Sequence, residues 1–141
     1  MKIYVIGSTA FVKDMVAYTD KLVADGYNAW IHPEYRDYVT NKNHSHLKRI
    51  EDGEHAKVKI ENDYIRQHYN HILESDAIFV VNMEKNNIKG YIGGNVLMEL
   101  GFAYVNNKKI FLLNSIPDMP YKEEIEAVLP IVLNGEFSKI K

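Results

Sequence analysis

The sequence predicts a single α/β domain in which a doubly wound, parallel sheet of about five strands is flanked by helices. Short apolar runs alternate along the chain with segments whose apolar residues recur at helical spacing. One run, residues 77–81, is apolar throughout, which is typical of a central strand buried on both faces. The 141 residues suit one domain, so we treat 1–141 as a single unit.

The first part of the chain has the pattern of a strand–helix–strand unit. Residues 3–6 are a short apolar strand, and apolar residues recur at helical spacing over 11–23. Residues 27–31 are a second strand, which Pro33 closes. Because two parallel strands need a crossover of about this length, the three elements predict a βαβ unit.

Residues 34–56 show no sustained period and mix aromatic residues, histidines and charges of both signs. A connection this long in a compact domain is typical of a lid or a binding loop, so we expect a lid-like, ligand-dependent segment at about 34–56. The alternative for its lysines and acidic residues is a solvated, salt-bridged segment. Its histidines, His44, His46 and His55, lack the spacing of a metal motif, and we expect no metal.

The rest of the chain continues the alternation of helices and strands. The expected elements are a helical pattern over 58–73, a strand at 77–81, a helix at 96–105, a strand at 109–114, a short helix at 122–128 and an edge strand at 131–133. The right-handed crossover rule then predicts a flavodoxin-like or Rossmann-like sheet of order 2-1-3-4, with or without a fifth strand.

Composition excludes several classes of protein. The formal charge of −2 offers no general attraction for a nucleic-acid polymer, and the absence of cysteine excludes thiol nucleophiles and thiolate metal sites. No apolar run is long enough for a signal h-region or a membrane span. We therefore expect a cytoplasmic protein without a membrane partner.

Small and polar residues should converge at the carboxyl edge of the sheet, where such folds bind ligands. They follow the first strand, follow the third strand, and open the helix after it: Gly7, Ser8, Thr9, Asn82, Gly93, Gly94 and Asn95. Glycines at a helix N-terminus let backbone N–H groups approach an anion. The alternative is that the glycines only serve a tight turn from loop to helix.

Glu99 is the most informative single residue, because it lies in the apolar helix 96–105 within about one turn of its start. Its carboxylate is either exposed on the outer face of the helix or buried and functional, since an unpaired buried charge is costly. A buried carboxylate beside a sugar would suit attack on an anomeric carbon, as in retaining glycoside cleavage.

Three stretches extend this interpretation: Asp-Ala-Ile-Phe-Val-Val at 76–81, Gly-Asn-Val-Leu-Met-Glu-Leu-Gly-Phe-Ala at 94–103, and Lys-Lys-Ile-Phe-Leu-Leu at 108–113. They resemble the nucleoside 2-deoxyribosyltransferase superfamily, which includes the 2′-deoxynucleoside 5′-phosphate N-hydrolases. The opening Tyr-Val-Ile-Gly-Ser at 4–8 resembles that of the hydrolases. The resemblance spans residues 3–8 and 76–113, under half of the chain, and its most specific part is the block around Glu99.

The resemblance implies roles for individual residues. Glu99 matches the catalytic glutamate, which attacks C1′ of the sugar and forms a glycosyl-enzyme intermediate. Tyr4 matches a tyrosine that lines the same pocket, and Gly7 and Ser8 match a turn that holds phosphate or sugar. The chemistry needs no cofactor, and the superfamily usually builds its pockets at subunit interfaces, which implies a homo-oligomer.

The chain also departs from the family pattern. Family members commonly carry an aspartate where this chain has His68, the hydrolases have an arginine where it has Ala10, and Gly93 replaces a serine or an acid. His68 is either a core histidine or a proton donor to the leaving base with a pKa near neutrality. Because these positions differ, the family's substrate specificity does not transfer.

Three functions follow as hypotheses. The first is an N-glycosidase or deoxyribosyltransferase that cleaves the N-glycosidic bond of a nucleoside or nucleoside 5′-monophosphate, with Glu99, Tyr4 and His68 as its catalytic residues. The second is a non-catalytic nucleotide-binding module that uses the same pocket. The third is an interaction protein with a vestigial pocket, which would bind no nucleotide. Base, sugar and phosphate requirement stay open.

Overall fold

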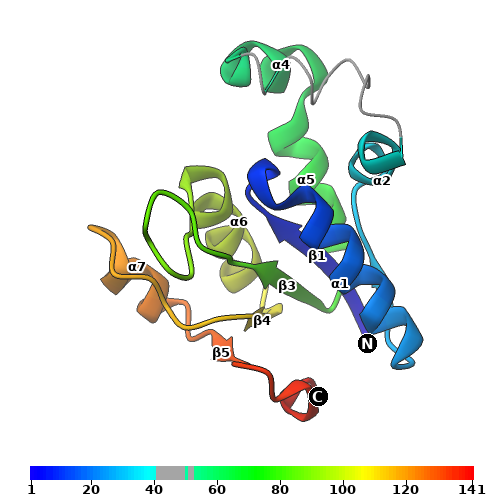
Figure 1. Ribbon diagram of the computed structural model, residues 1–141, viewed down its shortest axis with the longest axis vertical. Helices are drawn as coiled ribbons and strands as arrows, with labels where there is room; N and C mark the ends of the chain where they lie inside the picture. Colours follow the sequence, from blue (N-terminus) through cyan, green and yellow to red (C-terminus); the bar gives the residue numbers. More distant parts are fainter. Residues whose placement is uncertain (41–49, 51–52) are drawn as a thin grey trace.

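The fold is a five-stranded parallel sheet with helices on both faces (Figure 1), seen in a computed structural model that describes residues 1–40, 50 and 53–141. The strands are β1 (Lys2–Gly7), β2 (Asn28–Trp30), β3 (Ala77–Val81), β4 (Lys109–Leu112) and β5 (Ile131–Val132). Their order is β2-β1-β3-β4-β5, and every neighbouring pair is parallel. The predicted doubly wound α/β class and the order of the first four strands are confirmed.

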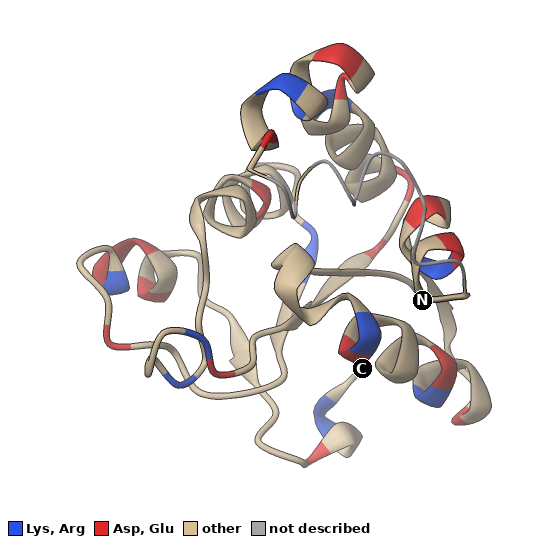
Figure 2. Cartoon of the chain, turned by 45° about the horizontal axis from the view of Figure 1, so that its top comes forward, with Lys and Arg blue, Asp and Glu red and all other residues tan. Residues whose placement is uncertain are grey.

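The described helices follow the expected alternation. They are α1 (Val12–Ala24), α2 (Pro33–Thr40), α4 (His55–Asn62), α5 (Tyr64–Leu73), α6 (Gly94–Val105) and α7 (Lys122–Ala127), with short 3₁₀ turns η1 (Thr9–Phe11) and η2 (Phe137–Lys139). Lys and Arg are interspersed with Asp and Glu along these helices (Figure 2). None of the helices in the described ranges is long and apolar enough to cross a membrane.

Alternation along β1 divides the core into two layers. Ile3 and Val5 pack in the layer that contains the buried side chains of α1, whereas Tyr4 and Ile6 point to the opposite face, into the layer formed with α5, α6 and α7. The register Tyr4↔Ile78 places β1 beside β3 at the centre of the sheet. Because successive strand residues point to opposite faces, Tyr4 is directed towards α5.

The sequence-based expectation of a structureless segment from residue 34 is wrong at its beginning, where α2 forms. Pro33 does not simply close β2; it occupies the first position of α2, where the missing N–H is not needed and the fixed φ angle favours a helix. His32 caps this end, since its Nδ1 accepts the N–H of Glu34 at 3.2 Å and its carbonyl accepts that of Tyr35 at 3.0 Å. Residues 41–49 and 51–52, with His44, His46 and the middle of the expected lid, lie outside the described residues.

The helical pattern over 58–73 is split into α4 and α5 at Asp63, whose φ of 52° lies in the left-handed region. The N–H of Asp63 bonds back to the carbonyls of Lys59 and Ile60 and ends α4 there. Since the chain changes direction at this residue, α4 stands apart from α5 in Figure 1. The break places Lys59, in the last turn of α4, at the pocket described below.

Candidate active site

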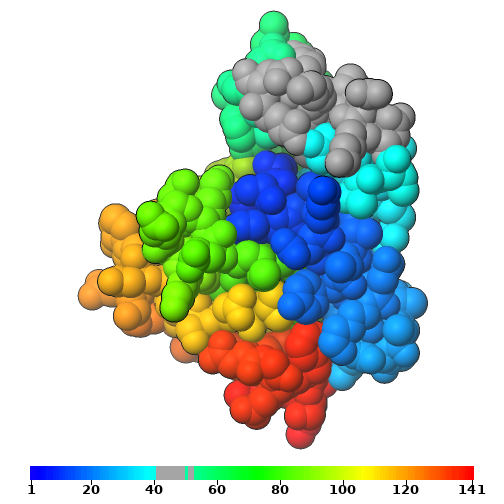
Figure 3. Space-filling model, viewed as in Figure 1, coloured from blue at the N-terminus to red at the C-terminus, as the bar shows by residue number. Residues whose placement is uncertain are grey.

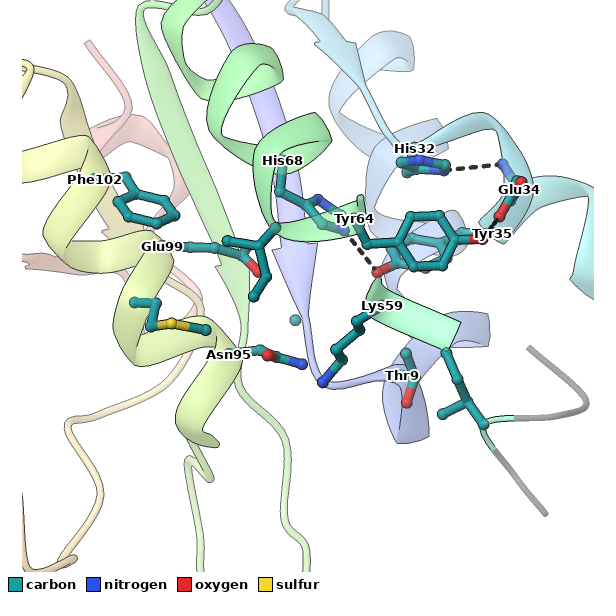
Figure 4. A pocket seen from close by; sticks show the side chains of 14 residues that line it. Thr9, His32, Glu34, Tyr35, Lys59, Tyr64, His68, Asn95, Glu99 and Phe102 are labelled. Carbon is teal, nitrogen blue, oxygen red and sulfur yellow. Dashed lines mark hydrogen bonds between the residues drawn. The ribbon is translucent and has the colours of Figure 1, made fainter. Parts of the chain in front are cut away.

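The predicted carboxyl edge contains a pocket. Gly7 at the end of β1, Thr9 in η1 and Asn95 at the start of α6 line it together with residues from α2, α4, α5 and α6. Figure 3 shows the start of α1, in blue, against the segment that follows β3, in green, at this edge. In Figure 4, the polar ends of Glu99, Lys59 and Asn95 are directed into the same space. Two of the three segments expected to converge, the one after β1 and the one that opens α6, therefore meet at the pocket.

Glu99 is buried, with 8% of its surface exposed, and lines the pocket. It shares the inner face of α6 with Val96, Leu100 and Ala103, so the alternative of an outward-facing carboxylate is wrong. Its Oε2 is fully buried and has no hydrogen-bond partner among the described residues. Because buried polar atoms are nearly always paired, an unpaired oxygen facing a pocket is typical of a ligand site.

Burial raises the pKa of Glu99 to about 8, and the positive charge of Lys59 opposes part of this rise. Lys59 responds in the opposite sense, since desolvation lowers its pKa while the charge of Glu99 raises it. A carboxyl group and an amine thus face each other across the pocket with pKa values moved towards one another. Perturbed titratable groups in a cleft are characteristic of functional sites.

The resemblance implies that Tyr4 lines the pocket, but the residues that line it do not include Tyr4, whose hydroxyl lies against two histidines. The Tyr4 hydroxyl lies 2.7 Å from Nδ1 of His68 and 3.1 Å from Nδ1 of His71. On the other side of the His68 ring, Nε2 lies 3.4 Å from the hydroxyl of Tyr35. Tyr4 itself has no exposed surface and supports the pocket from the sheet.

The expectation that His68 has a pKa near neutrality is wrong. Burial lowers the pKa of His68 to about 3, and unfavourable electrostatic interactions of the protonated ring with His32, His71 and Lys59 lower it further. The imidazole is therefore neutral at physiological pH. It can accept a proton at one ring nitrogen while it donates from the other, but it does not carry an extra proton that it could donate by itself.

His32 and Gln67 form a second polar contact beside the pocket. Nε2 of His32 lies 2.9 Å from Oε1 of Gln67, and since Nδ1 accepts the N–H of Glu34, the ring proton is on Nε2. Tyr64 donates its hydroxyl to the carboxylate of Glu34. Sequence reasoning had missed this carboxylate at the pocket, because α2 was not expected.

A spacing signal would have found several of these residues. Tyr64, Gln67, His68 and His71 recur every three or four residues on one face of α5, the spacing of a helix face. The face is polar although it points towards the sheet. A polar stripe on an inward face of a helix indicates a buried network.

Among the glycine and serine residues predicted to bind a ligand, Gly7 lines the pocket, whereas the others lie at the starts of helices. Gly7 lines the pocket, and a Cβ there would approach the Val81 carbonyl to 2.9 Å, so the position requires glycine. Ser8 accepts the N–H of Ala10 at 3.4 Å and begins η1. Gly93 is the N-cap of α6 beside the Tyr91 ring, while Gly94 has open space beside it.

Asn82 has a structural position at the end of β3. Its buried side chain donates to the carbonyl of Asn114 at 2.9 Å and accepts the Asn114 N–H at 2.9 Å, with further bonds at 3.3 Å to the carbonyls of Gly90 and Ser115. It ties the loops after β3 and β4 together. The residues that line the pocket do not include it.

Comparison with protein-family models, with curated proteins and with solved structures gave no match to this chain. Within residues 1–40, 50 and 53–141, no group of three or more His, Asp or Glu side chains is placed to hold a metal ion. The chemistry of the pocket is therefore argued from its own residues.

Proposed function

We propose that this chain cleaves the N-glycosidic bond of a nucleoside or nucleoside 5′-monophosphate, with Glu99 as the nucleophile. The observation that carries the proposal is the buried, unpaired Oε2 of Glu99 in a pocket that also holds a lysine. The sequence around Glu99 and at the N-terminus supports it through its resemblance to the nucleoside 2-deoxyribosyltransferase superfamily.

In the proposed reaction, an oxygen of ionised Glu99 bonds to C1′ as the bond from C1′ to the base nitrogen breaks. The electron pair of that bond leaves with the base, which takes up a proton. Water or a second base then attacks C1′, loses a proton to solvent and releases the carboxylate, giving hydrolysis or transfer.

The other lining residues suit such a substrate. Tyr35 and Phe102 offer aromatic surface for a base, and Thr9 and Asn95 offer hydroxyl and amide groups for sugar or phosphate oxygens. Lys59 favours the ionised form of Glu99, which the reaction requires. An anionic substituent on the sugar would also be attracted to its ammonium group.

The test is to incubate the protein with a panel of nucleosides and 5′-monophosphates, with and without an acceptor base, and to separate the released base by chromatography. Wild-type protein should release base and Glu99→Gln should not, while both bind the substrate. Saturable binding without release by wild-type protein would instead identify a binding module. Failure to bind any member of the panel would overturn both functions.

A further inference from the structure

Four side chains form a continuous hydrogen-bonded series from the surface to the pocket. His71 Nδ1 lies 3.1 Å from the Tyr4 hydroxyl, which lies 2.7 Å from Nδ1 of His68, and Nε2 of His68 lies 3.4 Å from the Tyr35 hydroxyl. His71 is partly exposed at the outer end, whereas His68 and Tyr35 line the pocket. We propose that this series is a proton relay that supplies the leaving base, an inference that rests on the proposed function.

One set of donors and acceptors directs every proton of the relay towards the pocket. His71 donates from Nδ1 to Tyr4, Tyr4 donates to Nδ1 of His68, and His68 donates from Nε2 to Tyr35, which leaves the Tyr35 hydroxyl proton free to enter the pocket. When the bond from C1′ to the base breaks, the base nitrogen takes the Tyr35 proton. Tyr35 then takes a proton from Nε2 of His68, whose Nδ1 takes one from Tyr4, and Tyr4 takes one from Nδ1 of His71. His71 takes a proton from water at Nε2.

No member of the relay has to carry a lasting charge. The neutral ring of His68 changes from one tautomer to the other as it passes a proton, which suits a group whose pKa burial lowers to about 3. Burial raises the pKa values of Tyr4 and Tyr35, so both hydroxyls keep their protons until they are replaced. The same burial would make a permanently charged proton donor costly at these positions.

A purely structural role would need fewer hydrogen-bond partners than the relay residues have. One partner satisfies a buried tyrosine hydroxyl, yet Tyr4 lies between two histidines. In the relay, each ring of the two histidines has a second nitrogen directed away from Tyr4.

The outer end is held in place by its neighbours. The His71 ring lies 4.7 Å from the Trp30 ring, whose N–H donates to Ser75 at 2.8 Å, and the Ser75 hydroxyl donates to the His71 carbonyl at 3.0 Å. The charged or titratable groups around it are His32 before α2, Lys2 and Tyr4 on β1, His68 on α5, and Glu74 directly after α5. Burial lowers the pKa of His71, with His32 and Lys2 adding to this and Glu74 opposing it.

The experiment uses His71→Ala, Tyr4→Phe and, as a matched control, His55→Gln, which changes an exposed histidine on α4. With the nucleoside that wild-type protein cleaves fastest, the first two variants should lose about tenfold or more of kcat at nearly constant KM, and the control should lose nothing. Added imidazole should restore His71→Ala. The analogue 1-methylimidazole should not, because it cannot change tautomers.

The outcomes separate the relay from the proposed function. Base release by wild-type protein together with unchanged kcat in His71→Ala and Tyr4→Phe would overturn the relay and leave the Glu99 mechanism intact. A loss of activity in His71→Ala that imidazole does not restore would also overturn it, as a structural effect. Tyr4→Phe removes one oxygen only, so it tests the relay even if His71→Ala fails to fold. A wild-type protein that releases no base would overturn the proposed function itself.

Discussion

The hydroxyl of Tyr4, at the centre of the sheet, lies 2.7 Å from Nδ1 of His68 on α5. This contact joins a strand residue without exposed surface to a histidine that lines the pocket. The orientation of the His68 ring is therefore set by the sheet. Substitution of either residue should affect the pocket as well as the core.

Glu99→Gln should remove a pH dependence of stability. The pKa of Glu99 is raised from 4.5 to about 8, so its contribution to folding is fully present below 4.5 and is lost as pH rises through about 8. Between these pH values this group should lower the free energy of unfolding of wild-type protein by at most about 1.4 kcal/mol per pH unit. The glutamine variant should show no such loss at this position.

Urea unfolding between pH 5 and 8 measures this difference, with Glu123→Gln, an exposed site on α7, as the control. Parallel stability curves for wild-type protein and Glu99→Gln would show that the carboxyl group is not perturbed by burial.

Lys59→Met should raise the pKa of Glu99 further, because the ammonium group that opposes the shift is lost. If ionised Glu99 is the nucleophile, the rise of kcat/KM with pH should move to higher pH in this variant. The control is Lys57→Met, which changes an exposed lysine on the same helix that lies 3.9 Å from Glu54. A pH profile displaced equally in both variants would argue against a specific pairing of Lys59 with Glu99.

His68→Gln should make the protein less sensitive to acid. Because the folded-state pKa of His68 is lowered from 6.5 to about 3, its stabilising contribution is present above 6.5 and is lost as pH falls towards 3. The difference in unfolding free energy between pH 7 and pH 4 should therefore be smaller in the variant. A fall as steep as that of wild-type protein would place the acid sensitivity at other groups.

Asn82→Ala should destabilise the fold by about 2–3 kcal/mol, because it leaves the buried N–H of Asn114 and neighbouring carbonyls without their partner. Substrate affinity should change little in the folded fraction, since Asn82 does not line the pocket. Asn70→Ala, at an exposed position on α5, is the matched control for denaturant unfolding. Equal stability of the two variants would contradict the structural role of Asn82.

The sequence by itself determined the sheet. The all-apolar run Ala77–Val81 and the short strand at 3–6 are local patterns, and the hand of parallel crossovers leaves few strand orders to choose from. It also singled out Glu99, first by its position in an apolar helix and then by the resemblance, but it left open whether the carboxylate points inward or outward. α2 was missed because Pro33 was interpreted as an end, although proline is equally suited to begin a helix.

Only the tertiary structure decided which way Glu99 points. α6 is apolar on nearly all sides, with Met98 and Tyr104 exposed while Glu99 is buried, so periodicity could not establish its inner face. The hydrogen-bonded series from His71 to Tyr35 likewise joins α5, β1 and α2, segments separated by up to 67 positions in the sequence. Contacts of that kind depend on how the elements pack, and no local pattern encodes them.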